Sequence, residues 1–283
     1  MKNRRGLTSE LRRRANALQN RIELRLRLRR DRRKVRDHPF YQHFEELAVP
    51  WSLIDPRVAV DTDAEFVYYR IPKAANSTVT WSLFRTRGGP TDADIETAKG
   101  DAFLTPSHLD TTMADCAATS FLQFTVVRNP YTRLASAYLD KIAGSEPQCR
   151  RVAKTLGIAA DAIKFSDFID YLEHCAGLHR NAHWAPQADL LPLSPLELDL
   201  ILYTEDLDRD LPRLLRRLYP ERTAIIERCE HKRRAQGDRD ARKNPRASAW
   251  LETLYDDALR RRVRRLYERD FEAFGYDPER VPT

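Results

Sequence analysis

Three strand-like runs constrain the fold of this chain more than any other feature. They are "EFVYYRI" at 65–71, "SFLQFTVVR" at 120–128 and "LDLILYTEDL" at 198–207. A continuous apolar run such as 120–128 is typical of a strand that is buried on both faces of a sheet. Helical patterns separate the runs, and strands that alternate with helices indicate a mostly parallel sheet covered on both faces. The sequence therefore predicts an α/β fold.

The helical patterns and their boundaries complete this prediction. Pro130 stands at the first turn of one of them, where proline is favoured. Residues 37–64, which contain three prolines, are predicted to be irregular, and 87–94 to be a loop. No boundary divides 37–283, so we predict one α/β domain that follows an N-terminal arm of residues 1–36. The predicted helices are 76–85, 131–142, 165–174, 207–218 and 247–272.

The N-terminal arm holds most of the positive charge. Residues 1–36 contain 15 Lys/Arg and 3 Asp/Glu, a net charge of +12, so the rest of a chain of net charge +7 carries −5. The high pI therefore does not make the whole protein a polyanion binder. Within 7–36, apolar residues at helical spacing predict a basic amphipathic helix, although "IELRLRL" also fits a strand. Such a helix suits an anionic membrane, an acidic partner or nucleic acid, or only packing and oligomerisation. The apolar residues are Leu11, Ala15, Leu18, Ile22 and Leu26.

The cysteines and the lack of a long apolar segment favour a cytoplasmic protein. Cys116, Cys149, Cys175 and Cys229 form no CxxC pair and have irregular spacings, which argues against a zinc site or a disulfide framework. No stretch reaches the roughly 18 apolar residues of a membrane span, and the N-terminus lacks the apolar core of a secretory signal. Any membrane contact is therefore expected to be peripheral, at the inner membrane surface and through the arm.

The turn "PKAANST" has the composition of an anion site. It follows the first strand and begins a helix, whose N-terminal N–H groups and dipole favour negative charge. A Walker loop, GxxxxGK[ST], would place its lysine directly before the hydroxyl residue, and this turn has no glycine, which disfavours an ordinary ATPase. A helix cap with an exposed lysine is the alternative. Small residues, one charge and two hydroxyls make up the turn: Pro72, Lys73, Ala74, Ala75, Asn76, Ser77 and Thr78.

A second polar turn follows the second strand, in "VVRNPYTRLASAY" at 126–138. Arg128 ends the strand, and Ser136 lies about two helical turns further on. Arg133 shares a helix face with Ser136. Arg128 and Ser136 suit a second anion, because a guanidinium makes two parallel hydrogen bonds to phosphate; a salt-bridged strand exit is the alternative. In parallel sheets both turns lie at the edge where ligands bind.

Five segments, in order from about residue 65 to 277, resemble the carbohydrate sulfotransferases, and in particular the HNK-1, chondroitin and heparan 2-O-sulfotransferase types. The resemblance implies a P-loop-like sulfotransferase fold and a bacterial-type soluble enzyme. It implies sulfuryl transfer from 3′-phosphoadenosine-5′-phosphosulfate (PAPS), without a metal, to a hydroxyl of a polysaccharide, oligosaccharide or glycolipid. The product is 3′-phosphoadenosine-5′-phosphate. The segments are "YYRIPKAANSTV", "FTVVRNPYTRLASAYLDK", "NAHWAPQADLL", "LILYTEDLDRDL" and "RRLYERDFEAFGYD".

The resemblance also implies roles for individual residues. Residues 72–78 would hold the 5′-phosphosulfate, with Lys73 on the bridging oxygen, and Arg128 and Ser136 would hold the 3′-phosphate. His108 is the expected base that activates the acceptor hydroxyl, and His183 is its rival. Asp110 and Glu205 are lesser candidates for the same role. The basic stretch 231–246 is expected to close over the 3′-phosphate through Lys243, Asn244 and Arg246, or else to be a solvated loop or a site for an acidic glycan.

The sequence departs from the family pattern in two places, and it leaves three alternative functions open. Asn129 replaces the acidic residue that usually follows the arginine, and the first turn lacks the glycine of many relatives. The alternatives are a nucleic-acid or membrane-surface binder that acts through the arm and has a degenerate nucleotide-binding fold, a Mg²⁺-dependent kinase or NTPase, and a fold that only binds nucleotide. We expect no nucleic-acid partner, and the acceptor and the oligomeric state are not specified by the sequence.

Overall fold

A computed structural model describes residues 15, 18–26, 29, 35, 37–44, 48–100, 102–143, 147–229, 251 and 253–282. Residues 18–26 are helical, and we call them the arm helix. The prediction of an arm of 1–36 separate from a domain of 37–283 stays a prediction, because only part of the arm is described. The longer helices of the body are α3 (Asn76–Arg87), α5 (Thr111–Thr119), α6 (Pro130–Lys141), α7 (Pro147–Leu156), α8 (Phe165–His174), α9 (Leu207–Leu218), α11 (Asp257–Leu266) and α12 (Glu268–Phe274). The short helices are η1 (Pro39–His43), α2 (Trp51–Ile54), η2 (Asp55–Arg57), α4 (Ile95–Gly100), η3 (Pro106–His108), η4 (Ala160–Ala162), η5 (Leu178–Arg180), η6 (Ala188–Leu190), η7 (Pro195–Glu197) and η8 (Thr204–Asp206).

A four-stranded sheet in the order β1-β2-β3-β4 organises the fold. Strands β2 (Phe66–Tyr69), β3 (Leu122–Val127) and β4 (Leu200–Tyr203) are parallel, with Tyr69 opposite Thr125 and Val127 opposite Tyr203. The carboxyl ends of the three strands therefore meet at one edge, as the alternating pattern predicts. Strand β1 (Val58–Asp61) pairs antiparallel with β2. The prediction that 37–64 is irregular was wrong here.

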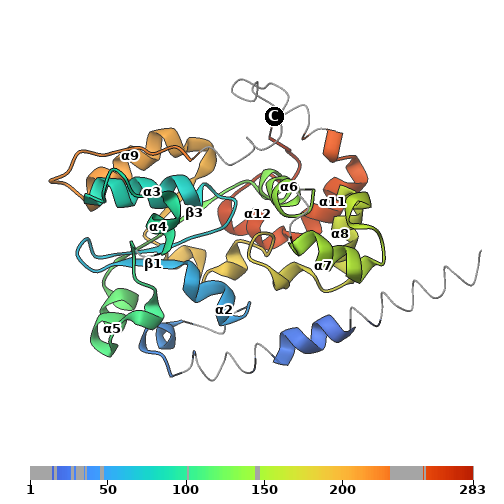
Figure 1. The fold of residues 1–283 in the computed structure, drawn as a ribbon, viewed down its shortest axis with the longest axis horizontal. Helices are drawn as coiled ribbons and strands as arrows, with labels where there is room; N and C mark the ends of the chain where they lie inside the picture. The colour runs from blue at the N-terminus through green and yellow to red at the C-terminus, as the bar shows by residue number, and fades with distance from the viewer. Residues whose placement is uncertain are drawn as a thin grey trace, which may run out of the picture.

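Alternate residues of each strand face two different cores, because successive side chains of a strand point to opposite faces. Phe66, Tyr68 and Phe124 pack against α3 and α9. Val67 and Tyr69 lie on the other face, in a core with α5 and η1. Figure 1 shows α3 and α9 on one side of the sheet and α5 on the other. The sequence predicted this coverage of both faces.

A third core lies beside the sheet and is built from helices and the segments that connect them. It joins α6, α7, α8 and α11 with the start of α12, and buries the side chains of Tyr131, Phe168 and Trp184. Figure 1 shows α7, α8 and α11 grouped together next to α6. Helix α6 therefore connects the carboxyl edge of the sheet to this helical lobe, and its two ends are held by different parts of the molecule.

The predicted helix boundaries are confirmed in some places and wrong in others. Helices α8 and α9 have the predicted bounds, and α3 and α6 differ from prediction by one or two residues at an end. The expected single helix of 247–272 breaks at Tyr267, whose φ of −118° and ψ of 21° are not helical. This break separates α11 from α12, and part of 247–256 lies outside the described residues.

Candidate active site

The first polar turn has a strained backbone and leads into a helix that lacks a side-chain cap. Lys73 and Ala75 have positive φ values, 69° and 52°, which residues other than glycine rarely adopt. Such strain concentrates at ligand sites. Ala75 is the N-cap of α3 and no side-chain cap bond forms there in the described structure. The first N–H groups of α3 therefore remain unsatisfied by a cap, which suits an anion.

Lys73 points from this turn to helix α6. Its Nζ lies 3.0 Å from Oδ2 of Asp140, and its side chain is only 6% exposed. Lys141 lies 3.2 Å from the same carboxylate oxygen. Burial lowers the pKa of Lys73, although the Asp140 hydrogen bond opposes this. Partial burial acts to raise the pKa of Asp140, but its bonds and charges from Lys73 and Lys141 outweigh it, so this pKa is below its ordinary value.

The second polar turn lies directly against the first. Nη1 of Arg128 donates to the carbonyl oxygen of Lys73 at 3.3 Å, and its Nε donates to Oγ1 of Thr132 at 3.0 Å. Ser136 is half-buried one turn beyond Thr132. Thr132, Ser136 and Asp140 repeat at intervals of four residues, so they share the face of α6 that meets the first turn. Asn129 caps α6 by accepting from the Tyr131 N–H at 3.0 Å, so its departure from the family pattern preserves the helix start.

Arg133 is buried. The sequence pattern had placed it on the same face of α6 as Ser136. Its guanidinium is buried and donates to three backbone carbonyls, those of Pro72 at 3.0 Å, Ala185 at 2.8 Å and Ala182 at 2.9 Å. All three nitrogens of the guanidinium are thereby engaged. Arg133 connects the first polar turn to the segment 181–187, which the sequence separates by more than 100 residues.

Two buried side chains, those of Gln187 and Asp270, hold the backbone at Arg128, where strand β3 ends. The amide of Gln187 accepts from the Arg128 N–H at 3.0 Å and donates to the Arg128 carbonyl at 2.8 Å. Asp270 in turn accepts from the N–H groups of Gln187 and Ala188, at 2.8 and 2.9 Å. Burial raises the pKa of Asp270 to about 6, although the charge of Arg133 and these two hydrogen bonds act to lower it.

His183 is held in the same region with one ring nitrogen fixed. Oδ1 of Asn181 accepts from the His183 backbone N–H at 3.0 Å and lies 2.8 Å from Nδ1 of its ring. Since this oxygen can only accept, Nδ1 carries the proton and Nε2 has the lone pair. Burial, followed by the charges of Lys141, Arg57 and Lys73, lowers the pKa of His183 to about 3, while Asp140 acts to raise it. The ring therefore offers a free lone pair at Nε2, whereas so low a pKa makes it a weaker base than an ordinary histidine.

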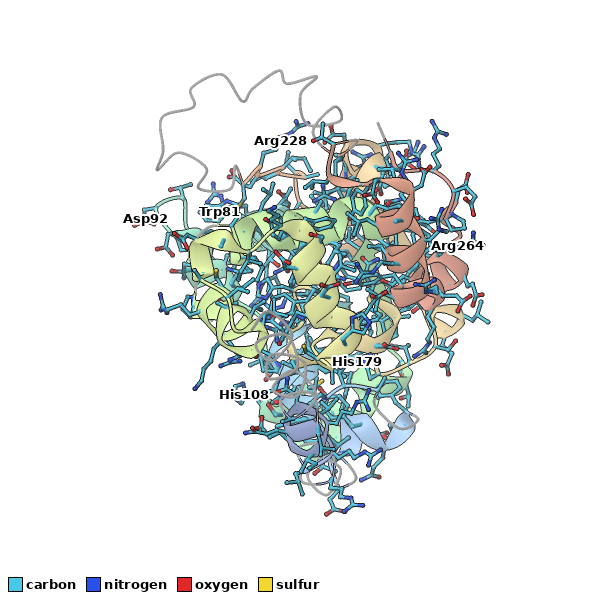
Figure 2. All side chains as sticks on the ribbon, turned by 90° about the vertical axis from the view of Figure 1, so that its right-hand side faces the viewer. Trp81, Asp92, His108, His179, Arg228 and Arg264 are labelled. Carbon is cyan, nitrogen blue, oxygen red and sulfur yellow. The ribbon has the colours of Figure 1, made fainter. Side chains whose placement is uncertain are left out.

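His108 lies on a different part of the sheet edge. It ends η3, beside β1, and its exposed ring has Nδ1 3.3 Å from Oγ1 of Thr105. Figure 2 shows His108 on the outer surface of the molecule. Among the described contacts, none joins His108 to Lys73, Arg128 or Ser136, whereas His183 lies within the electrostatic influence of Lys73. Arg133 thus joins the segment of His183 to the first polar turn, and no such contact among the described residues reaches His108.

The remaining sequence candidates separate into structural residues and residues outside the described chain. Asp110 caps α5 by accepting from the Met113 N–H at 2.9 Å. Glu205 accepts from the Asn129 N–H at 3.0 Å and from the Tyr276 hydroxyl at 3.1 Å, so it supports the second turn. Lys243, Asn244 and Arg246 lie outside the described residues. The described chain leads toward them from Cys229, whose N–H donates to Oγ1 of Thr78 at 3.3 Å.

Sequence reasoning missed four residues that shape this site. Three of them contact a residue that is far away in the sequence: Asp140 contacts Lys73, Gln187 contacts Arg128, and Asp270 contacts Gln187. The fourth, Asn181, contacts the nearby His183, and no sequence pattern indicates this pair. The register of α6 offered one signal, because Asp140 follows Ser136 by four residues. Within the described residues, no three His, Cys, Asp or Glu side chains gather closely enough to bind a metal ion.

A strained strand–turn–helix element with a nearly buried lysine thus meets a second, arginine-bearing strand exit at the carboxyl edge of the sheet. A model of the sulfotransferase family matches residues 56–277, so the chain belongs to the sulfotransferase family. The resemblance drawn from the five ordered segments is thereby confirmed.

One similar protein is carbohydrate sulfotransferase 10 of Xenopus laevis, which is 27% identical over 180 residues. The aligned part covers 56% of this chain and 48% of that protein, so the chain matches about half the length of its relative. No solved structure matches the chain. In the part of the chain that the structure describes, no helix has both the length and the apolar character to cross a bilayer.

The protonation state of His183 gives a direct prediction. Its pKa of about 3 lies below the ordinary 6.5, so between these values the unfolded chain binds more protons at this residue than the folded protein does. This histidine therefore makes the folded protein less stable as the pH falls through that window. We expect ¹⁵N NMR of the imidazole to show a neutral Nδ1–H ring from pH 8 to about pH 4, with His183→Gln identifying the resonance. A protonation midpoint near pH 6, or an Nε2–H ring, would contradict this geometry.

Proposed function

We propose that this protein transfers a sulfuryl group from PAPS to a carbohydrate hydroxyl. The observation that supports this most is the contact between the two polar turns, where Arg128 meets the carbonyl of Lys73. Two anion-binding elements that touch each other suit a donor with phosphate groups at both its 3′ and 5′ positions. The family match supports the transferase class, and the name of the Xenopus relative supports a carbohydrate acceptor.

The residues present fit such a donor. The uncapped start of α3 offers N–H groups for a 5′-phosphosulfate, and the half-buried Ser77 and Thr78 add hydroxyls. Arg128 and Ser136 face the second anion from the next strand and helix. PAPS, when bound, supplies the sulfuryl group and a phosphate leaving group. The proposed late contact of Lys243 and Arg246 with the 3′-phosphate lies outside the described residues.

Two residues of the chain carry the proposed chemistry. Lys73 lies in the turn that leads into α3 and would stabilise the negative charge that grows on the leaving oxygen. His183 would accept the proton of the acceptor hydroxyl at Nε2, with its ring oriented by Asn181 through Nδ1. Of the two histidines that the sequence offers, we propose His183 as the base, because Arg133 joins its segment to the first polar turn through the carbonyls of Pro72, Ala182 and Ala185. His108 stays the alternative.

Calorimetric titration with 3′-phosphoadenosine-5′-phosphate, in the absence of metal, tests the donor site. We expect clear preference for this ligand over ATP and 5′-AMP. Arg128→Ala is expected to weaken binding by about 10- to 100-fold, since a hydrogen bond to a charged group contributes about 1.5–3 kcal/mol. Ser136→Ala is expected to weaken it by about fivefold, as one hydrogen bond contributes roughly 1 kcal/mol.

The matched control for these variants is Arg213→Ala, because Arg213 is an exposed arginine on α9 that pairs only loosely with Asp210. This variant is expected to bind like the parent protein. A folded protein that binds none of the three nucleotides, or that prefers ATP only with Mg²⁺, would overturn the proposed function. In the first case the degenerate fold, and in the second the NTPase, becomes the better hypothesis.

A further inference from the structure

The arm helix is attached to the body by one of its faces. Nδ2 of Asn20 donates to the carbonyl oxygen of Cys175 at 2.8 Å. Arg180 forms an ion pair with Glu23 at 2.9 Å, and its side chain is mostly buried. Asn20 and Glu23 lie three residues apart, so they share a helix face. These contacts fix the rotation of the helix about its own axis, and with it the direction of the opposite face.

The opposite face presents an apolar row to solvent. Leu18, Ile22 and Leu26 follow at intervals of four residues and are 61%, 49% and 57% exposed. Other exposed large hydrophobic residues in the described chain, such as Leu104 and Leu196, are not part of such a row. Single exposed leucines are ordinary on a protein surface, whereas a contiguous apolar row marks an interaction site.

Arginines border the apolar row along its length. Arg21 and Arg25 are exposed and, at 100° per residue, lie within or beside the same half of the arm helix as Leu18, Ile22 and Leu26, and the exposed Arg29 follows a little further along the chain. The helix thus combines an apolar row with a band of positive charge on its outer side. Figure 1 shows the arm helix at the periphery of the molecule, as the short blue helix along its lower side.

We propose that this outer face binds an anionic phospholipid membrane, with the arm helix lying in the plane of the interface. An interfacial helix buries apolar side chains among the lipid chains while its arginines contact the anionic headgroups. Nucleic acid would use the arginines but would leave the apolar row in water. A second copy of the chain would cover the row but would bring two bands of arginine together. An anionic membrane is the partner that matches both the apolar row and the band of arginines.

The attachment of the helix links this surface to the candidate active site. Residues 175–180, which hold the helix, run directly into the segment of Asn181 and His183. Figure 2 labels His179 within this stretch. A protein bound through the arm helix therefore holds this part of its site at a fixed position relative to the membrane. The binding itself does not depend on the proposed sulfuryl transfer, so each can fail without the other.

Sedimentation with vesicles tests the proposal on the full chain. We expect binding to vesicles of phosphatidylcholine and phosphatidylglycerol in a 3:1 ratio, and little binding to phosphatidylcholine alone. The triple variant Leu18→Ser/Ile22→Ser/Leu26→Ser is expected to lose at least about 100-fold in affinity, because it removes the apolar burial. Arg21→Gln, Arg25→Gln and Arg29→Gln are each expected to lose about fivefold. Leu196→Ser, which removes a leucine that is 95% exposed elsewhere, is the matched control and should bind normally.

Three outcomes would overturn the proposal. The first is vesicle binding that the triple serine variant retains, since only charge would then matter. The second is absence of binding to anionic vesicles together with tight binding to a single- or double-stranded oligonucleotide, which would make the arm a nucleic-acid site. The third is a dimer in sedimentation velocity that the serine variant abolishes while vesicles bind neither protein. Circular dichroism of each variant confirms that the body is folded.

Discussion

Replacement of Lys73 by methionine is expected to lower the turnover of the proposed sulfuryl transfer by about 10²–10³-fold, the effect of removing one group that stabilises charge in a transition state. Lys73 is nearly buried beside the start of α3, where such a charge would develop. The stability of the protein should change little, because Asp140 keeps the ion pair with Lys141. Radiolabelled sulfate transfer to an accepted oligosaccharide, together with thermal unfolding, measures both quantities.

The matched control for Lys73 is Lys141→Met, which removes the other lysine of the same ion-pair group. Lys141 extends from the last turn of α6 and does not belong to the strained turn. We expect this variant to lose less than tenfold in turnover. Equal losses for the two variants would mean that Lys73 acts only through the general positive charge of the region. An active Lys73→Met variant would remove Lys73 from the mechanism.

Replacement of Arg133 by leucine is expected to destabilise the protein by about 3–5 kcal/mol, the usual cost of breaking a buried charged network. The carbonyls of Pro72, Ala182 and Ala185 would lose their donor in a region closed to water. For a chain of this size the loss corresponds to a fall in melting temperature on the order of 10 °C. Arg133→Lys should recover little, because one ammonium cannot replace a planar group that serves three acceptors. Differential scanning calorimetry measures the shift.

Arg264→Leu is the control for this experiment. Arg264 is labelled in Figure 2, pairs with Glu279 on the surface, and has a side chain that is 51% exposed. Exposed ion pairs contribute at most about 1 kcal/mol. A similar loss of stability in both variants would show that Arg133 contributes no more than an ordinary surface arginine, and the connection between the first turn and 181–187 would then be unimportant.

The sequence predicted the elements whose pattern is long and locally determined. Three strands and helices α8 and α9 were found because apolar runs and helical periodicity are properties of the segments themselves. Strand β1 was missed, since its four residues lie in a proline-containing stretch and gain their structure by pairing with β2. Helices α5 and α7 were also not predicted. The break at Tyr267 was missed because both helices around it have good helical sequences.

The candidate site was predictable where one segment carries the chemistry by itself. The strand–turn–helix pattern identified Lys73, and the strand exit identified Arg128. The burial of Arg133 was not predictable, because an arginine on a helical pattern gives no sign of which carbonyls it will meet. The same limit applies to the two histidines. The sequence does not distinguish them, and only the contacts of Arg133, which join 181–187 to the first polar turn, do so.

The glycine-free turn at Lys73 and Ala75 has a consequence for the thermodynamics of ligand binding. Neither residue prefers a positive φ, so the conformation is imposed by the surrounding fold and not by the turn. The conformational entropy of this turn is therefore already lost when the protein folds. A ligand that binds there meets a preformed surface and avoids most of the ordering cost that weakens binding to a flexible loop. The strained alanine thus moves part of the unfavourable free energy of binding into the free energy of folding.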